Sequence, residues 1–410
     1  MQVPFFRFAH DPVALAGIEE CLRSGWLTTG GKVREFERRF AETLGGDRDL
    51  HAVALNSCTA ALHLALEAIG LQRGEVVLVP TMTFAATAEV VRYFDATPVF
   101  VDTEPDTLNM SVASLRETLQ RLQVGLPLPG LGVITGKVRA IIPVHYAGQP
   151  CDLASVHDVA AEYGIDVIED AAHAFPAGWV IGDSSIRYVG NGTSRVICFS
   201  FYANKTITTG EGGMAVTRDA TLAERMRLMS LHGMNRDAWK RFEASGTWDY
   251  QLVAPGFKYN MTDIAAALGL SQLAQAEQFR SARARICERY DRAFAALDAV
   301  EPLVRREGLL HSHHLYVIRL RLELLDIDRA AFIEQLKERG VLCSVHWRPL
   351  HMHPYYVETF GYASEDYPVA ACVWPRIISL PLFPSMTEEE VDHVIQSVTD
   401  VVRTHAGRAV

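Results

Sequence analysis

Short apolar runs alternate with stretches of helical spacing through the first two-thirds of this chain. Seven runs are candidate strands, at residues 52–55, 75–80, 98–101, 140–144, 165–169, 196–199 and 214–217. The segments 59–69 and 85–94, which follow the first two runs, have the spacing of helices. Strands this apolar are buried on both faces, as in parallel sheets covered by helices. The pattern therefore predicts an α/β protein with a mostly parallel sheet of seven strands.

The pattern changes after about residue 265. The elements predicted there are a long helix at 264–297, strands at 315–320 and 341–345, and a helix at 328–339. A last helix is expected after Thr387, because Thr387 and Glu390 have the spacing of a capping box. Fewer strands and more helices predict a separate α+β lobe.

This change divides the chain into three expected parts. They are an N-terminal arm and helix at 1–45, a large domain at 46–265 and a small C-terminal domain at 266–410. A length of 410 residues supports more than one domain. Residues 124–132 are rich in Gly and Pro, and predict a surface loop before the fourth strand.

Composition and charge narrow the class of protein. Apolar residues make up 49% of the chain, as in globular proteins with sizeable cores, and the net charge of −10 with no basic run argues against nucleic-acid binding. Seven scattered cysteines without a CxxC pair favour a reducing compartment. The first residues do not resemble a secretory leader, and no run reaches membrane-spanning length. We therefore expect a cytoplasmic protein without a membrane partner.

The segment 200–213 carries the strongest chemical signal. Lys205 follows an apolar strand, five residues after Ser200 and just before a glycine cluster. A lysine in such a partly desolvated place loses its proton readily and can form an imine. Taken alone, Lys205 equally fits a surface lysine that follows a strand, because lysines are rarely buried.

An acidic residue stands at a comparable place upstream. Asp170 ends another apolar strand, and ligands of open α/β sheets bind at such carboxyl ends. An aspartate there also fits the cap of a following helix at Ala171 and Ala172, and the two roles are compatible. Together with Lys205 it suggests pyridoxal phosphate (PLP), with the lysine forming a Schiff base and the aspartate keeping the pyridine nitrogen protonated.

Residues at further strand ends fit the rest of this cofactor. The turn at 56–59 precedes a helix, whose N-terminal N–H groups and positive dipole end suit a phosphate. A plain N-cap by Ser57 or Thr59 fits that turn equally well. Ser200 adds a hydroxyl for the same phosphate, and Phe84 supplies a ring of the kind that stacks on a pyridine.

Three other motifs lack the residues that their chemistry requires. The stretch 130–137 resembles a Walker loop, but Leu131 stands at the first required glycine and Val138 replaces Ser/Thr. No GxGxxG fingerprint follows the first strand, so a nicotinamide enzyme is not supported. The histidines at 311, 313, 314, 346, 351 and 353 have no cysteine or carboxylate at matching spacing, and no metal site is predicted.

Taken together, these segments resemble the sugar aminotransferases of the DegT/DnrJ/EryC1/StrS family. The resemblance runs from Ser24 to Pro384, and its strongest motifs are at 56–63, 79–84, 142–148, 167–173 and 200–213. The segments 57–59, 255–263 and 344–348 are most similar to the subgroup that aminates UDP-linked 4-keto sugars, such as the enzyme forming 4-amino-4-deoxy-arabinose.

The resemblance implies a fold-type-I PLP enzyme that works as a homodimer with shared active sites. By position, Lys205 is the catalytic lysine that forms the internal aldimine, and Asp170 is the catalytic partner of the pyridinium nitrogen. The further cofactor contacts that it implies are Phe84 on the ring, His173 beside the ring hydroxyl, and Cys58, Thr59 and Ser200 at the phosphate.

The resemblance also implies that the segment 256–260 reaches the phosphate of the neighbouring subunit. Many members have Asn and Arg where this chain has Lys258 and Asn260, so which of the two makes the contact is left open. The substrate-pocket residues that it implies are Thr29, His346 and Trp347. The loops at 124–136 and 178–192 are longer than is usual in the family, and the second lies near the expected sugar-nucleotide entrance.

The implied reaction is amino transfer by a ping-pong mechanism. Glutamate gives its amino group to the cofactor and leaves as 2-oxoglutarate, and the aminated cofactor then attacks the ketone of a nucleotide-diphospho keto-sugar, expected at C4. Two alternatives stay open. A PLP-dependent sugar dehydratase is one, although one branch of these has histidine at the lysine position and another needs an iron–sulfur centre. The other is a regulatory protein that binds PLP or a sugar nucleotide without turnover.

Overall fold

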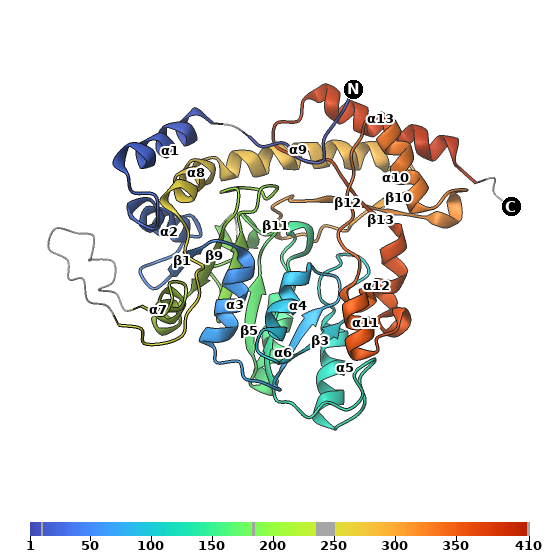
Figure 1. The fold of residues 1–410 in the computed structure, drawn as a ribbon. Coiled ribbons are helices and arrows are strands. Elements are labelled where there is room, and N and C mark those ends of the chain that lie inside the picture. The colour runs from blue at the N-terminus through green and yellow to red at the C-terminus, as the bar shows by residue number, and fades with distance from the viewer. Residues whose placement is uncertain (10, 183–184, 235–250, 408–410) are drawn as a thin grey trace.

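The computed structural model describes residues 1–9, 11–182, 185–234 and 251–407. Its largest element is a seven-stranded sheet in the order β1-β9-β8-β5-β4-β2-β3 (Figure 1). The strands are β1 (His51–Leu55), β2 (Val76–Pro80), β3 (Thr97–Val101), β4 (Val138–Ile141), β5 (Asp166–Asp170), β8 (Val196–Ser200) and β9 (Gly213–Thr217). All neighbours pair in parallel except β9, which is antiparallel to β1 and β8. The predicted mostly parallel sheet of seven strands is confirmed.

Helices cover both faces of this sheet. Those on one face are α3 (Cys58–Ala68), α4 (Ala85–Arg92) and α7 (Ala220–Met229), and those on the other are α2 (Gly31–Thr43), α5 (Val112–Gln123), α6 (Leu153–Tyr163) and α8 (Asp263–Ala274). In β2, Val77 and Val79 pack toward α3 and α4, whereas Val76 and Leu78 pack toward α5 and α6. Because successive side chains alternate between two buried faces, the strand is apolar without interruption.

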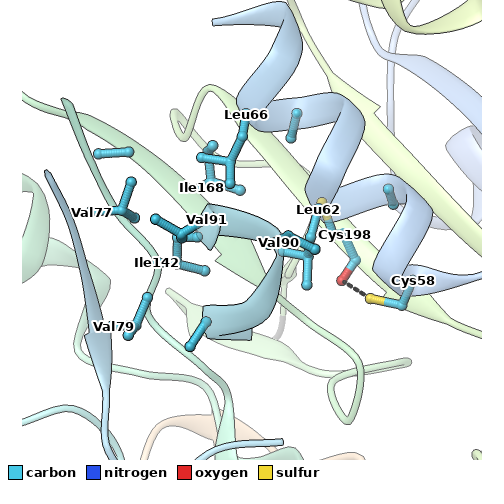
Figure 2. Close-up of a cluster of buried hydrophobic side chains, with 14 of the residues drawn as sticks. Cys58, Leu62, Leu66, Val77, Val79, Val90, Val91, Ile142, Ile168 and Cys198 are labelled. Carbon is cyan, nitrogen blue, oxygen red and sulfur yellow. Dashed lines mark hydrogen bonds between the residues drawn. The ribbon is translucent and has the colours of Figure 1, made fainter. Parts of the chain in front are cut away.

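Figure 2 shows the core between the sheet and the helices α3 and α4. Leu62 and Leu66 of α3 lie over Ile168 of β5, and Val90 and Val91 of α4 lie near the strand residues beside it. All five side chains have at most 1% of their surface exposed. The apolar core therefore continues up to the edge of the sheet at which Asp170 ends β5.

The second lobe is built around the long helix α9 (Ala276–Phe294), seen across the top of Figure 1. The elements that share its core are β10 (Val300–Pro302), β12 (Tyr316–Leu320), α10 (Arg329–Glu338), β13 (Ile377–Leu380) and α13 (Glu388–Thr404). The short helices α11 (Pro354–Phe360) and α12 (Pro368–Val373) pack against the core of the large sheet, and α1 (Pro12–Ser24) belongs to the N-terminal segment. The capping box is confirmed, because Thr387 Oγ1 accepts the Glu390 N–H at 3.2 Å and the Glu390 carboxylate accepts the Thr387 N–H at 3.0 Å.

Among the described residues, none of the helices combines the length and apolar character that a membrane crossing requires. The boundaries of the three expected parts stay a prediction.

Three predicted elements differ from the structure. The helix expected at 264–297 is two helices, α8 and α9, because Gln275 between them has φ −106° and ψ 1°, outside the helical range. The strand expected at 341–345 is wrong, since Val341 and Ser344 make isolated bridges to two different partners, Val3 and Ser379.

The third difference concerns the expected loop at 178–192. Its residues form a hairpin of β6 (Gly178–Ile181) and β7 (Ser185–Tyr188), and β11 (Leu309–Leu310) pairs with β6 to make a three-stranded sheet. Residues 183–184 of that loop lie outside the described residues. The other expected loop, at 124–132, is mostly exposed, although the Leu128 N–H donates to the Gly132 carbonyl and its side chain is buried.

Candidate active site

Lys205 lies in a tight turn directly after β8. Its N–H donates to the Tyr202 carbonyl at 2.9 Å, and its side chain is partly buried. Burial lowers the pKa of the Lys205 ammonium to about 8, and the nearby carboxylate of Asp170 opposes that shift only in part. An amine with this pKa is partly unprotonated near neutral pH, which imine formation requires.

Asp170 is the last residue of β5 and is 4% exposed. Its Oδ1 accepts the Ala172 N–H at 3.1 Å, and its Oδ2 accepts the Thr87 hydroxyl at 2.7 Å. Burial raises the pKa of the Asp170 carboxyl, and these two bonds and the charge of Lys205 counteract that rise. The contact with Ala172 agrees with a capping role, but no helix begins there, so that alternative is wrong.

The sheet brings the lysine and the aspartate together. β5 and β8 are parallel neighbours, with Asp170 opposite Cys198, so the turn that holds Lys205 leaves the sheet at the edge where Asp170 ends its strand. Each group perturbs the pKa of the other. The two residues on which the sequence interpretation depends therefore lie close enough to interact, although they are 35 positions apart.

The N-terminus of α3 opens at the same edge. Ser57 Oγ accepts the Ala60 N–H at 3.0 Å, which confirms the N-cap, and Cys58 and Thr59 are the first helical residues. Cys58 Sγ donates to the Cys198 carbonyl at 3.6 Å, so its thiol points into the core (Figure 2). Of Cys58, only the backbone N–H is placed to meet a phosphate, as the first N–H groups of a helix do.

Three rings, those of His314, His346 and Trp347, lie close to the ring of His173. The ring of His173 is stacked on Trp347, with centroids 4.9 Å apart, and lies 4.2 Å from His314. Burial, with the charge of Lys205, lowers the pKa of His173 and His314 well below 6.5 and that of His346 to about 4. All three imidazoles are therefore neutral near pH 7. The Nδ1 atoms of His173 and His314 are buried and have no hydrogen-bond partner among the described residues.

The structure places the remaining predicted residues in two groups. Phe84 is the residue before α4, is 59% exposed, and has its ring 6.5 Å from Trp347. Ser200 ends β8, and its Oγ accepts the Tyr202 N–H at 3.3 Å.

The second group is a hydrogen-bonded chain from the N-terminal segment to residues 258–260. Lys258 Nζ donates to Asn260 Oδ1, and Asn260 Nδ2 donates to Thr29 Oγ1 at 2.7 Å. Asn260 is paired with Leu55 at the end of β1, and Thr29 lines a hollow of about 510 Å³ together with Trp26 and Asp263. This hydrogen-bonded chain therefore ends beside the turn that leads into α3.

Sequence reasoning missed three residues of this site. Thr83 and Thr87 form a hydroxyl chain to Asp170, and His314 was considered only as a metal ligand. The spacing of the two threonines, four residues apart around the start of a helix, was visible in the sequence. The carboxylate to which Thr87 donates, 83 positions further along the sequence, was not.

The residues present fit pyridoxal phosphate. A lysine of lowered pKa and a buried carboxylate suit the two ends of its ring, and the α3 N-terminus suits its phosphate. The unpartnered Nδ1 of His173 supplies a polar atom for the ring hydroxyl. The backbone at Ser57 packs directly against Gly213 and leaves no room for a side chain there. A Cβ at this position would lie 2.4 Å from the Ser57 carbonyl oxygen.

Comparison with known proteins agrees with this assignment. Residues 10–399 match the DegT/DnrJ/EryC1/StrS aminotransferase family. Protein MJ1066 of Methanocaldococcus jannaschii is 40% identical over 400 residues, which cover 98% of this chain and 97% of that protein. The spore coat polysaccharide biosynthesis protein SpsC of Bacillus subtilis is 41% identical over 388 residues, covering 94% and 93%. The PLP-form structure of Spr1654 from Streptococcus pneumoniae superimposes with a TM-score of 0.84 at 31% identity, covering 98% and 99%.

Proposed function

The chain belongs to the DegT/DnrJ/EryC1/StrS aminotransferase family and uses pyridoxal 5′-phosphate, and we propose that it moves an amino group from glutamate to the ketone carbon of a nucleotide-diphospho 4-keto-sugar. The observation that carries the proposal is the meeting of Lys205 and Asp170 at one edge of the sheet. The name of SpsC, a polysaccharide biosynthesis protein, supports a sugar as the amino acceptor.

Lys205 is the proton carrier of this reaction. The cofactor, when bound, supplies an electron sink for the carbon that loses or gains the amino group. Nζ of Lys205 removes the α-proton of glutamate in the first half-reaction and returns a proton to the sugar carbon in the second. Its pKa of about 8 allows Nζ to do both near neutral pH. Asp170 holds the proton on the ring nitrogen.

Other residues bind and orient the cofactor. The first N–H groups of α3, at Cys58 and Thr59, and the hydroxyl of Ser200 hold the phosphate. His173 faces the ring hydroxyl with its unpartnered nitrogen, and Phe84 covers one face of the ring.

The surroundings of His173 suit a sugar. His346 is neutral near pH 7, and Trp347 offers an apolar ring at the same place. Neutral donors and acceptors beside an indole match the hydroxyls and C–H faces of a pyranose. His346 and Trp347 therefore contact the sugar, and Thr29 completes the pocket.

We propose further that two copies of the chain share their active sites in the cytoplasm. Lys258 and Asn260 reach the phosphate bound by the neighbouring copy, and Thr29, hydrogen-bonded to Asn260, comes with them. All seven cysteines are free, which fits a reducing compartment.

The test is a transfer assay with ¹⁵N-glutamate. The purified protein is incubated with a panel of nucleotide-linked 3-keto and 4-keto sugars, and each is analysed by mass spectrometry for the mass change of amination and the ¹⁵N label. We expect label in a 4-keto sugar nucleotide, and none with Lys205→Ala. Label transferred only to a 3-keto sugar would refute the position, and 2-oxoglutarate release without any labelled sugar would refute the sugar as acceptor.

A further inference from the structure

A chain of two buried hydroxyls ends on Asp170. Thr83 Oγ1 and Thr87 Oγ1 are 2.7 Å apart, and Thr87 Oγ1 is 2.7 Å from Asp170 Oδ2. Thr83 lies just before α4 and Thr87 in its first turn, so the two face the same way, four residues apart. Both threonines are at most 1% exposed, and Asp170 is 4% exposed.

The chemistry of the partners sets the direction of every proton in this chain. An ionised carboxylate only accepts hydrogen bonds, so the Thr87 hydroxyl must donate to Asp170. A hydroxyl has one proton, and the oxygen of Thr87 therefore accepts the proton of Thr83. Each donation polarises the next hydroxyl, which strengthens the bond that reaches the carboxylate.

The two hydroxyls are needed because the buried surroundings of Asp170 disfavour the negative charge of its carboxylate. Burial raises the pKa of its carboxyl, and only part of that rise is offset by the positive charges of Lys205 and His145. The two thiols that face it, Cys58 and Cys198, stay protonated, since burial and the charge of Asp170 raise their pKa well above 9. The direct donors to the carboxylate are then Thr87 at Oδ2 and the Ala172 N–H at Oδ1.

We propose that Thr87, oriented by Thr83, is a positioning residue that keeps Asp170 ionised and in one rotamer toward the ring nitrogen of the cofactor. The inference rests on the proposed function, because it assumes that Asp170 meets that nitrogen. Thr87 acts through Asp170 and does not touch the substrate. A protonated ring nitrogen withdraws electrons and lowers the pKa of the nitrogen that joins Lys205 to the cofactor. Weakening Asp170 must therefore raise that pKa.

The experiment compares Thr87→Val, Thr87→Ser and Thr83→Val with the unaltered enzyme. Valine keeps the shape of threonine and removes the hydroxyl, whereas serine keeps the hydroxyl. Thr118→Val is the matched control, because Thr118 is buried in α5 and, among the described residues, its hydroxyl bonds only to the Ser114 carbonyl. We measure three quantities. They are the pH midpoint of the cofactor's visible absorbance, the dissociation constant for binding of the cofactor to the cofactor-free protein, and the melting temperature of the cofactor-free protein.

In Thr87→Val, we expect the absorbance midpoint to rise by about half to one pH unit and the cofactor to bind about tenfold to a hundredfold more weakly. Thr87→Ser should restore both values, and Thr83→Val should shift them in the same direction by a smaller amount. Thr118→Val should leave both unchanged. A midpoint that stays constant in Thr87→Val, or a shift that serine does not reverse, would overturn the positioning role.

Asp170→Asn separates this inference from the proposed function. If Asp170→Asn moves the absorbance midpoint upward and Thr87→Val does not, only the hydroxyl chain is refuted. If Asp170→Asn leaves the midpoint and the cofactor affinity unchanged, Asp170 does not meet the ring nitrogen, and the proposed site fails together with the inference.

Discussion

The pKa of Lys205 can be tested directly in the cofactor-free protein. Only an unprotonated amine attacks the aldehyde of pyridoxal phosphate, so the rate at which the cofactor bonds to Lys205 follows the fraction of neutral amine. Burial lowers the pKa of Lys205 from 10.5 to about 8. We therefore set the pH to a series of values between 6 and 11 and add the cofactor to the cofactor-free protein at each value.

The expected effect is large. With a pKa of about 8, roughly one Lys205 side chain in ten is neutral at pH 7, compared with about one in 3,000 for an ordinary lysine. The difference of about 2.5 pH units corresponds to about 3.4 kcal/mol between the two protonation states. At pH 7 the buried amine should thus react about 300-fold faster than its exposed counterpart would on protonation grounds alone.

The assay is stopped-flow absorbance after mixing the cofactor-free protein with pyridoxal phosphate across that pH range. N-acetyl-lysine in solution is the reference for an ordinary amine, and Lys205→Ala is the blank. The rate should rise with pH and level off with a midpoint near 8. In Asp170→Asn the midpoint should fall further, because the carboxylate of Asp170 stabilises the ammonium form. A midpoint above 10 in the unaltered protein would show that burial does not govern this lysine.

Three further predictions concern other parts of the site. Asp170→Asn should slow turnover about a hundredfold or more at cofactor concentrations that saturate the variant, measured as steady-state rate and absorbance, and a rate near that of the unaltered enzyme would contradict its role. Gly213→Ala should lower the free energy of unfolding by about 1–3 kcal/mol and weaken cofactor binding, because its Cβ would lie 2.4 Å from the Ser57 carbonyl oxygen. Gly31→Ala is the control, since a Cβ there meets no described atom within 4 Å, and equal melting curves for the two variants would refute the argument. Mixing inactive Lys205→Ala with inactive Asn260→Ala subunits should restore activity if sites are shared, since one site of each mixed dimer then has both residues intact, whereas no recovery would show that each chain completes its own site.

Much of the fold could be predicted because its signals are local. Each of the seven strands is an apolar run whose two faces are both buried, as Val76 to Val79 of β2 illustrate. The capping box at Thr387 is likewise complete within four residues. The predictions that were wrong depended on distant partners. Residues 341–345 look like a strand, but their backbone changes partner from the N-terminal segment to β13.

The candidate pair of lysine and aspartate could be singled out from the sequence, but the residues that support it could not. Lys205 and Asp170 stand out because a charged residue at the end of an apolar run is unusual. The threonines that hold Asp170 look like ordinary strand-end and helix residues, and only their contact reveals them. No signal in the sequence places His314 beside His173, because the two residues come from different lobes.

The amino-acid order by itself determined which segments are strands and helices, and which residues carry an amine or a carboxylate at a strand end, because these follow from side chains within a few positions. Only the tertiary structure decided that β5 lies beside β8, so that Asp170 and Lys205 meet. It also set the lowered pKa of Lys205 and the donors that keep Asp170 charged. Burial and hydrogen bonding depend on neighbours in space, and those neighbours are brought together by packing across the whole chain.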